Sequence, residues 1–253
     1  MSDLPLIWAD ALAEATGGRV RACCSTRAGG VSEGVWSSLN LGDHVGDNPR
    51  HVAENRHRLA AAAGLDSRRI GWLSQVHGTT VVDLDATPPG VPEADASVSR
   101  TQGTACAILT ADCLPVVLAD KDGQMVGAAH AGWRGLCEGV IERLAASMSC
   151  PPGRLVAWLG PAIGPEQFEV GPEVRDAFVR VDSASAAAFT AEGARPGRLM
   201  ADIYQLARRR LERAGVSRVM GGGECTVTDA DRFFSYRRDG QTGRMATLVW
   251  RAR

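Results

Sequence analysis

The sequence predicts an α+β fold in which short strands form antiparallel or mixed sheets. Apolar, β-branched stretches alternate with only about four segments of helical periodicity. Two pairs of these stretches are joined by turn signals typical of hairpins, around residues 114–131 and 233–250. No GxGxxG motif follows a strand, which argues against a doubly wound parallel sheet that binds a dinucleotide. No internal repeat or shift in composition marks a boundary, so a single domain is expected over residues 1–253.

The first strand is expected at residues 19–25 (RVRACCS), before a glycine-rich turn. A helix is predicted over residues 49–63, because Asn48 is a favourable N-cap, proline occupies the first helical position and Gly64 ends the pattern. Four further segments complete this half of the chain: apolar stretches at residues 71–77 and 79–85, a proline-rich loop at 85–95 and a buried strand at 104–110.

The first predicted hairpin joins LPVVLAD to MVGAAHA through the turn KDGQ. Its register depends on where the turn is centred. A centre between Lys121 and Asp122 places Cys113 opposite His130, whereas a centre one residue later places Cys113 opposite Gly132. In both registers Cys113 and His130 lie at the open end of the hairpin.

A long helix is predicted over residues 134–149, because leucine, valine and methionine recur there at every fourth position. The remaining elements are predicted from local patterns: a strand at 155–159, a helix opened by Pro172, a helix or tether at 183–194, a helix from Asp202 to Arg213, strands at 216–220 and 225–227, and the second hairpin, FFSYRR-DGQTG-RMATLVW.

The composition excludes several classes of protein. Hydrophobic residues make up 45% of the chain, enough for a sizeable core. The net charge of −1 gives no reason to expect a nucleic acid or an acidic membrane as partner. No apolar run approaches the ~20 residues that span a bilayer. The seven cysteines follow no regular spacing, and the first residues lack the pattern of a signal peptide, so a reducing, cytoplasmic location is expected.

Three residues in the middle of the chain, His77, Cys113 and His130, are of the types that bind zinc. Opposed residues of a hairpin have Cβ atoms about 4.5–5.5 Å apart, so Cys113 and His130 can reach one ion. His77 ends another short apolar segment and is the third candidate ligand. Three protein ligands leave one tetrahedral position open, which is typical of a catalytic zinc. The alternative is a buried cysteine near two hydrogen-bonded structural histidines.

The stretches SQVHG, TADCLPV and HAGWRG, in this order, resemble the signature of the YfiH-type laccase-domain family. The resemblance extends to STRAGGVSEG, SLNLGDHVGDNP, GPAIGP and FFSYRRDGQTGR, and so covers nearly the whole chain. Members of the family are described as polyphenol oxidases, purine nucleoside phosphorylases and a peptidoglycan editing factor. The resemblance implies a layered α-β-β-α sandwich in one domain, with His77, Cys113 and His130 as the metal ligands.

Further candidate residues accompany these motifs. The resemblance makes Arg27 and Asn40 candidate substrate-binding residues, although Asn40 also suits a turn. Gln75 and Arg134 are candidates of the same kind beside the proposed ligands. Asp112 has three open roles: it orients a ligand, takes a proton in catalysis or caps the turn.

A phosphate site is expected at Arg134, where the helix predicted after His130 begins. Helix N-termini offer unpaired N–H donors to anions, and the guanidinium adds a positive charge. If this is correct, Arg134→Ala raises the KM for phosphate and spares a reaction with water. The alternative is that Arg134 pairs with a structural carboxylate.

Several functions are compatible with these residues. The resemblance implies a zinc enzyme whose small-molecule partners are purine nucleosides and phosphate: phosphorolysis of adenosine, inosine and methylthioadenosine, and deamination of adenosine to inosine. Copper also accepts His and Cys ligands, as polyphenol oxidation would require, but a multicopper oxidase needs more than the five histidines present. A third hypothesis makes Cys113 a nucleophile and His130 its base, in a hydrolase of amide-type bonds that edits a cell-wall precursor. A structural metal in a binding protein is the non-enzymatic alternative.

Overall fold

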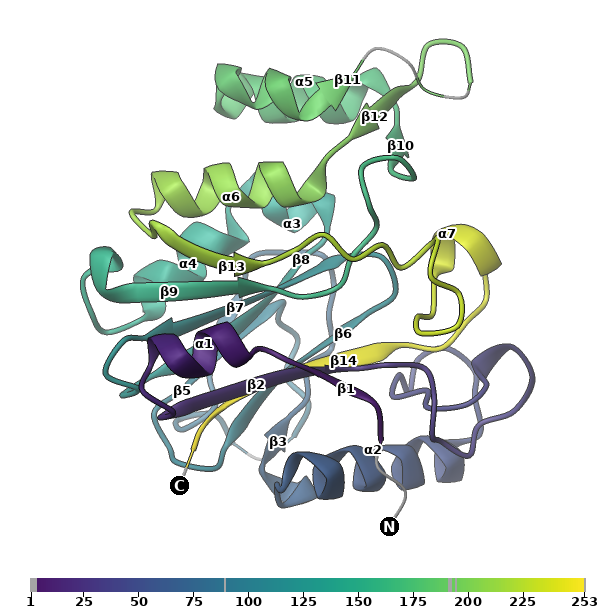
Figure 1. Cartoon of the computed structure of the whole chain (residues 1–253), viewed down its shortest axis with the longest axis vertical. Helices are drawn as coiled ribbons and strands as arrows, with labels where there is room; N and C mark the ends of the chain where they lie inside the picture. The colour runs from purple at the N-terminus through teal and green to yellow at the C-terminus, as the bar shows by residue number, and fades with distance from the viewer. Residues whose placement is uncertain (1–3, 89, 191–192, 194, 253) are drawn as a thin grey trace.

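The computed structural model describes residues 4–88, 90–190, 193 and 195–252. Their helices and strands lie in layers, as Figure 1 shows: helix α2 (Pro49–Ala63), two stacked sheets, and then helices α3 (Trp133–Glu138), α4 (Val140–Ser147) and α6 (Ile203–Arg213). Helix α5 (Pro172–Val181) lies beyond α6 with a small third sheet. Helices thus cover the outer faces of two packed sheets, which confirms the predicted α+β fold.

The first sheet has five strands in the order β1-β2-β14-β6-β3 and is antiparallel except for the β3–β6 pair. Its strands are β1 (Leu6–Trp8), β2 (Val20–Ser25), β14 (Met245–Arg251), β6 (Ala105–Thr110) and β3 (Ile70–Gly71). Helix α1 (Asp10–Ala15) connects β1 to β2.

The second sheet has six strands in the order β13-β9-β7-β8-β5-β4, with parallel pairs at its two edges. Its strands are β13 (Arg218–Gly221), β9 (Leu155–Leu159), β7 (Leu114–Asp120), β8 (Val126–Ala131), β5 (Ala96–Ser99) and β4 (Val81–Asp83). The third sheet contains β10 (Glu169–Val170), β12 (Leu199–Ala201) and β11 (Phe189–Thr190).

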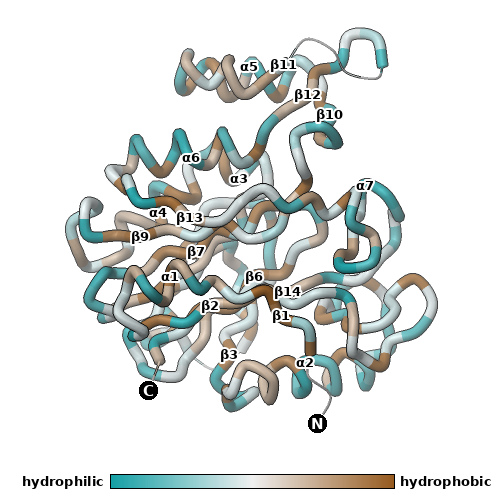
Figure 2. Tube along the Cα trace, viewed as in Figure 1, coloured by the Kyte–Doolittle hydropathy of each residue, from teal (hydrophilic) through white to brown (hydrophobic). Residues whose placement is uncertain are grey.

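The two large sheets are mixed, in agreement with the prediction: most neighbouring strands pair antiparallel, and the pairs β3–β6, β4–β5 and β9–β13 are parallel. Figure 2 shows that the apolar residues concentrate along the strands of the stacked sheets, with polar residues on the outer helices. Strand β7 explains this pattern: Val117 and Ala119 pack between the sheets, whereas Val116 and Leu118 pack under the helices. A strand buried on both faces produces the continuous apolar run LPVVLAD.

The predicted helix at residues 49–63 is confirmed at both ends. Asn48 accepts a hydrogen bond from the Arg50 N–H, and Gly64 adopts a left-handed conformation after the last turn. Buried Asn55 fixes α2 to the preceding loop: its side chain accepts from the Val31 N–H and donates to the Asn40 carbonyl. No helix among the described residues is long and apolar enough to cross a membrane.

Two predicted elements are wrong. The helix expected over residues 134–149 is two helices, α3 and α4, separated at Gly139, whose φ of 97° ends the first helix. The second hairpin is absent because residues 233–235 do not form a strand. Phe233 and Phe234 are buried between the sheets, and Ser235 accepts a hydrogen bond from Arg238 to cap the short helix α7 (Tyr236–Asp239). Its second half, β14, forms as predicted.

Two further predictions differ in detail from the structure. Residues 225–227 contribute a single bridge to Ala162 instead of a strand. Residues 183–188 form a short 3-10 helix and 189–190 form β11, while residues 191, 192 and 194 of the same prediction lie outside the described residues.

Candidate metal centre and substrate cleft

The hairpin β7–β8 pairs Pro115 with His130 and Leu114 with Ala131. This is the register centred between Asp122 and Gly123. Continued by one residue, it places Cys113 opposite Gly132, so the alternative that placed Cys113 opposite His130 is wrong. Cys113 precedes β7, His130 lies within β8, and His77 comes from the loop after β3. Three separate segments therefore meet at one end of the two sheets.

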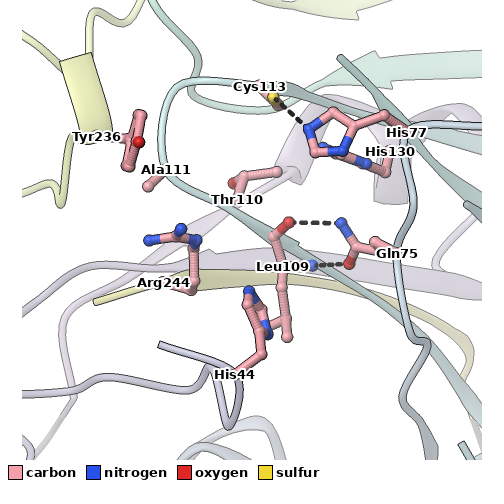
Figure 3. A pocket seen from close by; sticks show the side chains of 10 residues that line it. All are labelled: His44, Gln75, His77, Leu109, Thr110, Ala111, Cys113, His130, Tyr236 and Arg244. Carbon is pink, nitrogen blue, oxygen red and sulfur yellow. Dashed lines mark hydrogen bonds between the residues drawn. The ribbon is translucent and has the colours of Figure 1, made fainter. Parts of the chain in front are cut away.

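The three predicted ligands face one another there (Figure 3). Their ligand atoms all lie within 4.8 Å of one another, and Cys113 Sγ is 4.0 Å from His77 Nε2. Tetrahedral zinc with bonds of about 2.3 Å to sulfur and 2.0–2.1 Å to nitrogen separates two such atoms by about 3.6 Å. A small side-chain movement is enough to bring them to that distance. Among the described residues, no other group of His, Cys, Asp and Glu has this spacing.

Two glycines of the HAGWRG segment explain how the segments come so close. A Cβ atom on Gly132 would lie 3.0 Å from His77 Cδ2 and 3.2 Å from Cys113 Sγ. A Cβ atom on Gly135 would lie 2.6 Å from the Gly78 carbonyl oxygen. Side chains at these positions would push α3 and the His77 loop apart and open the ligand cluster.

Asp95, which the sequence analysis missed, holds two of the ligands. It is fully buried, and its carboxylate accepts from His130 Nδ1 at 2.8 Å and from the His77 N–H at 2.9 Å. It also accepts from the N–H groups of Val76 and Gly78. The bond to His130 keeps the proton on Nδ1, which leaves the Nε2 lone pair for a metal.

The backbone is strained on both sides of the cluster. His77 has a φ of 63° and Asp112 a φ of 92°, a region that residues other than glycine rarely adopt. Such conformations cost about 1–3 kcal/mol each and persist where the surroundings hold them. The three successive N–H bonds to Asp95 hold His77, while Thr226 Oγ1 and the Arg237 N–H both donate to the Asp112 carboxylate.

Charge within the cluster favours a thiolate at Cys113. Burial raises the pKa of the thiol, but the charge of His130 and hydrogen bonds from both histidines outweigh it and lower the pKa to about 6. Burial lowers the pKa of His130, while Cys113 and Asp95 raise it more strongly, to about 9. A deprotonated sulfur is the form that binds a metal.

Two hollows meet at the cluster and share His77, Ala111, Cys113 and Tyr236. The Trp133 hollow, of about 270 Å³, is otherwise lined by Asp112, Trp133, Arg134, Ile163, Phe168, Ile203 and Arg237. The Arg244 hollow, of about 230 Å³, is otherwise lined by His44, Gln75, Leu109, Thr110, His130 and Arg244 (Figure 3). Apolar surface exceeds polar surface in both hollows, but only the Trp133 hollow has the aliphatic and aromatic walls formed by Trp133, Ile163, Phe168 and Ile203.

Three of the five further candidate residues line these hollows. Gln75 lies in the Arg244 hollow, where its amide pairs with both backbone groups of Leu109 at 2.7 and 2.8 Å. Arg134 and Asp112 lie in the Trp133 hollow. Both carboxylate oxygens of Asp112 already accept hydrogen bonds, so a role in proton transfer stays a prediction.

Arg27 and Asn40 line neither hollow. The guanidinium of Arg27 donates to the carbonyls of Ser37 and Ala230, which joins two loops. Asn40 is fully buried, and its Oδ1 accepts from the N–H groups of Gly42 and Arg244. Their contacts are with the protein, and substrate binding by them stays a prediction.

The helix after His130 gives less support to a phosphate site than expected. Helix α3 has only six residues, so its dipole is small. Arg134 is exposed, and its guanidinium lies 4.5 Å from the centre of the Trp133 ring. It forms no ion pair with a carboxylate of the described residues, so the structural alternative finds no partner there.

Comparisons with known proteins agree with this arrangement. The family described as multi-copper polyphenol oxidoreductase laccase matches residues 21–252. The chain belongs to this family. It is 55% identical over 231 residues to the Escherichia coli purine nucleoside phosphorylase YfiH, covering 91% of this chain and 93% of that one. It is 43% identical to a purine nucleoside phosphorylase of Haemophilus influenzae, over 91% of this chain and 94% of the other.

Solved structures show the same fold in this laccase family. A Neisseria meningitidis protein matches with a TM-score of 0.91 and 47% identity, over 100% of both chains. YlmD from Geobacillus stearothermophilus matches with a TM-score of 0.82 and 31% identity, over 93% of both chains. The resemblance stated from the sequence motifs is therefore confirmed.

Four residues of this laccase-family chain were missed by sequence reasoning for the same reason. Tertiary structure alone brings them to the site. His44, Tyr236 and Arg244 line the hollows, and Asp95 binds His130. Tyr236 and Arg244 belong to FFSYRRDGQTGR, and His44 to SLNLGDHVGDNP, stretches noted for the resemblance without a role. Asp95 is the last residue of the proline-rich loop at 85–95, where an acidic residue suits a turn as well as a site.

We expect Asp95→Asn to weaken metal binding by about 10–100-fold, because residues that orient a ligating histidine contribute that much. An amide cannot accept all of the N–H bonds that the carboxylate accepts. The measurement is a zinc competition titration with a chromophoric chelator. Asp85→Asn is the matched control, since that carboxylate accepts from Ser99 and Arg100 away from the cleft. Wild-type zinc affinity in Asp95→Asn would contradict the role given to Asp95.

Proposed function

We propose that this chain is a metal-dependent purine nucleoside enzyme. It cleaves adenosine, inosine and methylthioadenosine with phosphate and deaminates adenosine to inosine. The observation that carries the proposal is the His77, Cys113 and His130 cluster, which borders a hollow with aliphatic and aromatic walls and a second hollow that contains Arg244. The names of the relatives, purine nucleoside phosphorylases at 43–55% identity, support the substrate class.

The Trp133 hollow suits a purine base. Trp133, Ile163 and Phe168 provide flat and apolar walls, and planar heterocycles bind to such surfaces by stacking and burial. Tyr236 stands at the border of both hollows and is 62% exposed, so its ring is available to a ligand. A base held here places its ribose next to the cluster.

The donor set fits zinc. One sulfur and two imidazole nitrogens are common zinc ligands, and three of them leave a position for water or substrate. When bound, the metal supplies a Lewis acid that stabilises negative charge on oxygen or nitrogen. His77, Cys113 and His130 would hold it, and Asp95 orients His130. Copper accepts the same ligand types, so zinc remains the proposal and copper its alternative.

In phosphorolysis a phosphate oxygen forms a bond to ribose C1′ as the bond from C1′ to N9 breaks. The electron pair of the broken bond stays on N9, and the proton carried by the phosphate ends on the base. The products are ribose 1-phosphate and the free purine. The walls of the Trp133 hollow hold the base as it leaves, and Arg134 at the rim is proposed to contact the substrate.

In deamination the oxygen of a water molecule bonds to C6 of adenosine and the amino nitrogen leaves as ammonia. One proton of the water must reach that nitrogen. Asp112 is the proposed carrier because it lines the Trp133 hollow beside Cys113. Its hydrogen bonds to Thr226 and the Arg237 N–H hold the carboxylate in place for this role.

A second candidate function has one observation in its favour. Cys113, His130 and Asp95 form a series of thiol, imidazole and carboxylate, as in hydrolases with a cysteine nucleophile. Such an enzyme would cleave amide-type bonds, for example in a cell-wall precursor. The second imidazole, His77, only 4.0 Å from the sulfur, has no role in that mechanism and favours the metal.

The test combines turnover with metal analysis. Purified protein is expected to convert inosine and phosphate to hypoxanthine and ribose 1-phosphate, and to convert adenosine to inosine without phosphate. Elemental analysis is expected to give about one zinc per chain, because the described residues contain one ligand cluster. A fully metal-loaded protein that turns over none of the three nucleosides would exclude the proposed function.

A further inference from the structure

The Arg244 hollow contains a cation that the proposed mechanism has not used. Arg244 immediately precedes β14, and Met245 pairs with Thr110 at the end of β6. Antiparallel pairing continued by one residue brings Arg244 beside Ala111, two residues before Cys113. The register of two strands thus places Arg244 in the hollow that is also lined by His77, Cys113 and His130 (Figure 3).

The Arg244 backbone is fixed on both sides. Its N–H donates to Asn40 Oδ1 at 2.9 Å, and its carbonyl accepts from the Leu41 N–H at 3.1 Å. Its side chain passes over Gly42, where a Cβ atom would lie 2.8 Å from Arg244 Cγ. This support holds the side chain in the hollow, as a binding residue requires.

Arg244 also lacks a counter-ion. Across the described residues, no carboxylate forms an ion pair with it. Nη1 donates to the carbonyls of Thr242 and Gly243, both at 3.0 Å, while Nε and Nη2 have no acceptor in the described part of the chain. Burial lowers the pKa of its guanidinium, an effect of lost solvation that an anionic ligand would reverse. Two adjacent free N–H donors match two oxygens of a phosphate.

The other two arginines at the cleft are less suited to this task. Arg237 has the same pattern of donors, since its Nη1 donates to the carbonyls of Gln167 and Glu169, but its side chain is exposed and lines the Trp133 hollow, whereas that of Arg244 is half-buried. Arg134 is exposed at the rim and lies over Trp133, in the hollow whose walls suit a base. A phosphate and a base must approach C1′ from opposite sides, because the entering and leaving groups flank that carbon. The Arg244 hollow and the Trp133 hollow both border His77 and Cys113, and each has walls of its own.

We propose that Arg244, with His44 beside it, binds the phosphate that attacks the nucleoside. This rests on the proposed phosphorolysis and names the place of its second substrate. His44 lines the same hollow and adds a polar group that hydrogen-bonds an oxyanion. The bond from the phosphate oxygen to C1′ forms over the metal ligands while the base leaves into the Trp133 hollow. Arg134 then contacts the nucleoside and not the phosphate.

The test compares the KM for phosphate and the KM for inosine in the zinc-loaded wild type, Arg244→Gln, Arg244→Lys and Arg134→Gln. Arg244→Gln is expected to raise the KM for phosphate by about tenfold or more and the KM for inosine by less than about threefold, since a hydrogen bond to a charged group contributes on the order of 1.5–3 kcal/mol. The KM for phosphate of Arg244→Lys should be intermediate, because lysine keeps the positive charge but lacks two adjacent N–H donors in one plane. Arg50→Gln, an exposed arginine of α2, is the charge-removal control.

Calorimetric titration with inorganic phosphate separates this inference from the proposed function. The wild type should bind phosphate, and Arg244→Gln should bind it at least about tenfold more weakly, whether or not phosphorolysis occurs. If the wild type binds phosphate in this way but cleaves no nucleoside, the proposed function fails and the anion site stands. An unchanged phosphate KM or affinity in Arg244→Gln overturns the proposal. A rise in phosphate KM in Arg134→Gln but not in Arg244→Gln returns the phosphate to Arg134.

Discussion

Replacing Cys113 with alanine is expected to remove the metal and reduce nucleoside turnover by about 10³-fold or more. The variant leaves two imidazoles, which do not supply the three ligands of a catalytic zinc site. A Lewis acid contributes several kcal/mol to stabilising the transition state, and each 1.4 kcal/mol is about tenfold in rate. The measurements are zinc content after dialysis and kcat/KM for inosine.

The fold should survive this change. Cys113 borders the two hollows and belongs to none of the three buried clusters of the core. The metal-free variant should therefore unfold within about 1 kcal/mol of metal-free wild type. Cys150→Ala is the matched control, because its half-exposed thiol lines neither hollow and should leave metal and activity unchanged. Stoichiometric zinc in Cys113→Ala would show that the sulfur is not a ligand.

Local patterns were enough to predict much of the fold. The helix Pro49–Ala63 is determined by Asn48, Pro49 and Gly64, which act within the helix itself. The strands β6 and β7 are continuous apolar runs because both faces of each sheet are covered. The layered arrangement itself came from the family resemblance, since periodicity does not show which sheet faces which.

The errors arose where periodicity and tertiary structure disagree. Leu136, Val140, Leu144 and Met148 are all buried, as the stripe predicted, yet α3 and α4 are separate helices. The stripe continues across the break at Gly139, so it could not reveal the break. The second hairpin was predicted wrongly because the DGQTG turn signal does not show whether the segment before it pairs as a strand. The preceding FFSYRR segment is instead held by its buried phenylalanines and by the cap of α7.

The sequence predicted three candidate metal ligands and, beside them, Gln75, Asp112 and Arg134, which line the hollows. Histidine and cysteine are residue types that predict a metal site, and the fold brings His77, Cys113 and His130 together. Asp95 and Arg244 act through contacts with residues far away in the chain, such as the bond between His130 and Asp95 or the bond between Asn40 and Arg244. A sequence contains no signal for such pairs without the strand register that creates them.

Metal removal is expected to convert Cys113 into a reactive thiolate. In the metal-free protein, burial opposes ionisation, but the charge of His130 and hydrogen bonds from both histidines lower the pKa to about 6. Because the thiolate is the nucleophile, alkylation by iodoacetamide should increase as pH rises through about 6, well below the ordinary pKa of about 8.5. At pH 7 the reaction should be only about two- to threefold faster than that of a free thiol, because the roughly 30-fold larger thiolate fraction is mostly offset by the lower nucleophilicity of a thiolate with a lower pKa.

Bound metal should suppress this reaction at every pH at which the site stays loaded, because the sulfur is then a ligand. Peptide mass spectrometry identifies the modified residue, and Cys113→Ser gives the background from the other cysteines. Buried Cys24 and Cys106, whose pKa burial raises to about 12, should stay unmodified. Activity should disappear with the chelator and return with added zinc. Full activity in metal-free protein, abolished by alkylation of Cys113, would instead identify a cysteine hydrolase in which His130 is the base and Asp95 orients it.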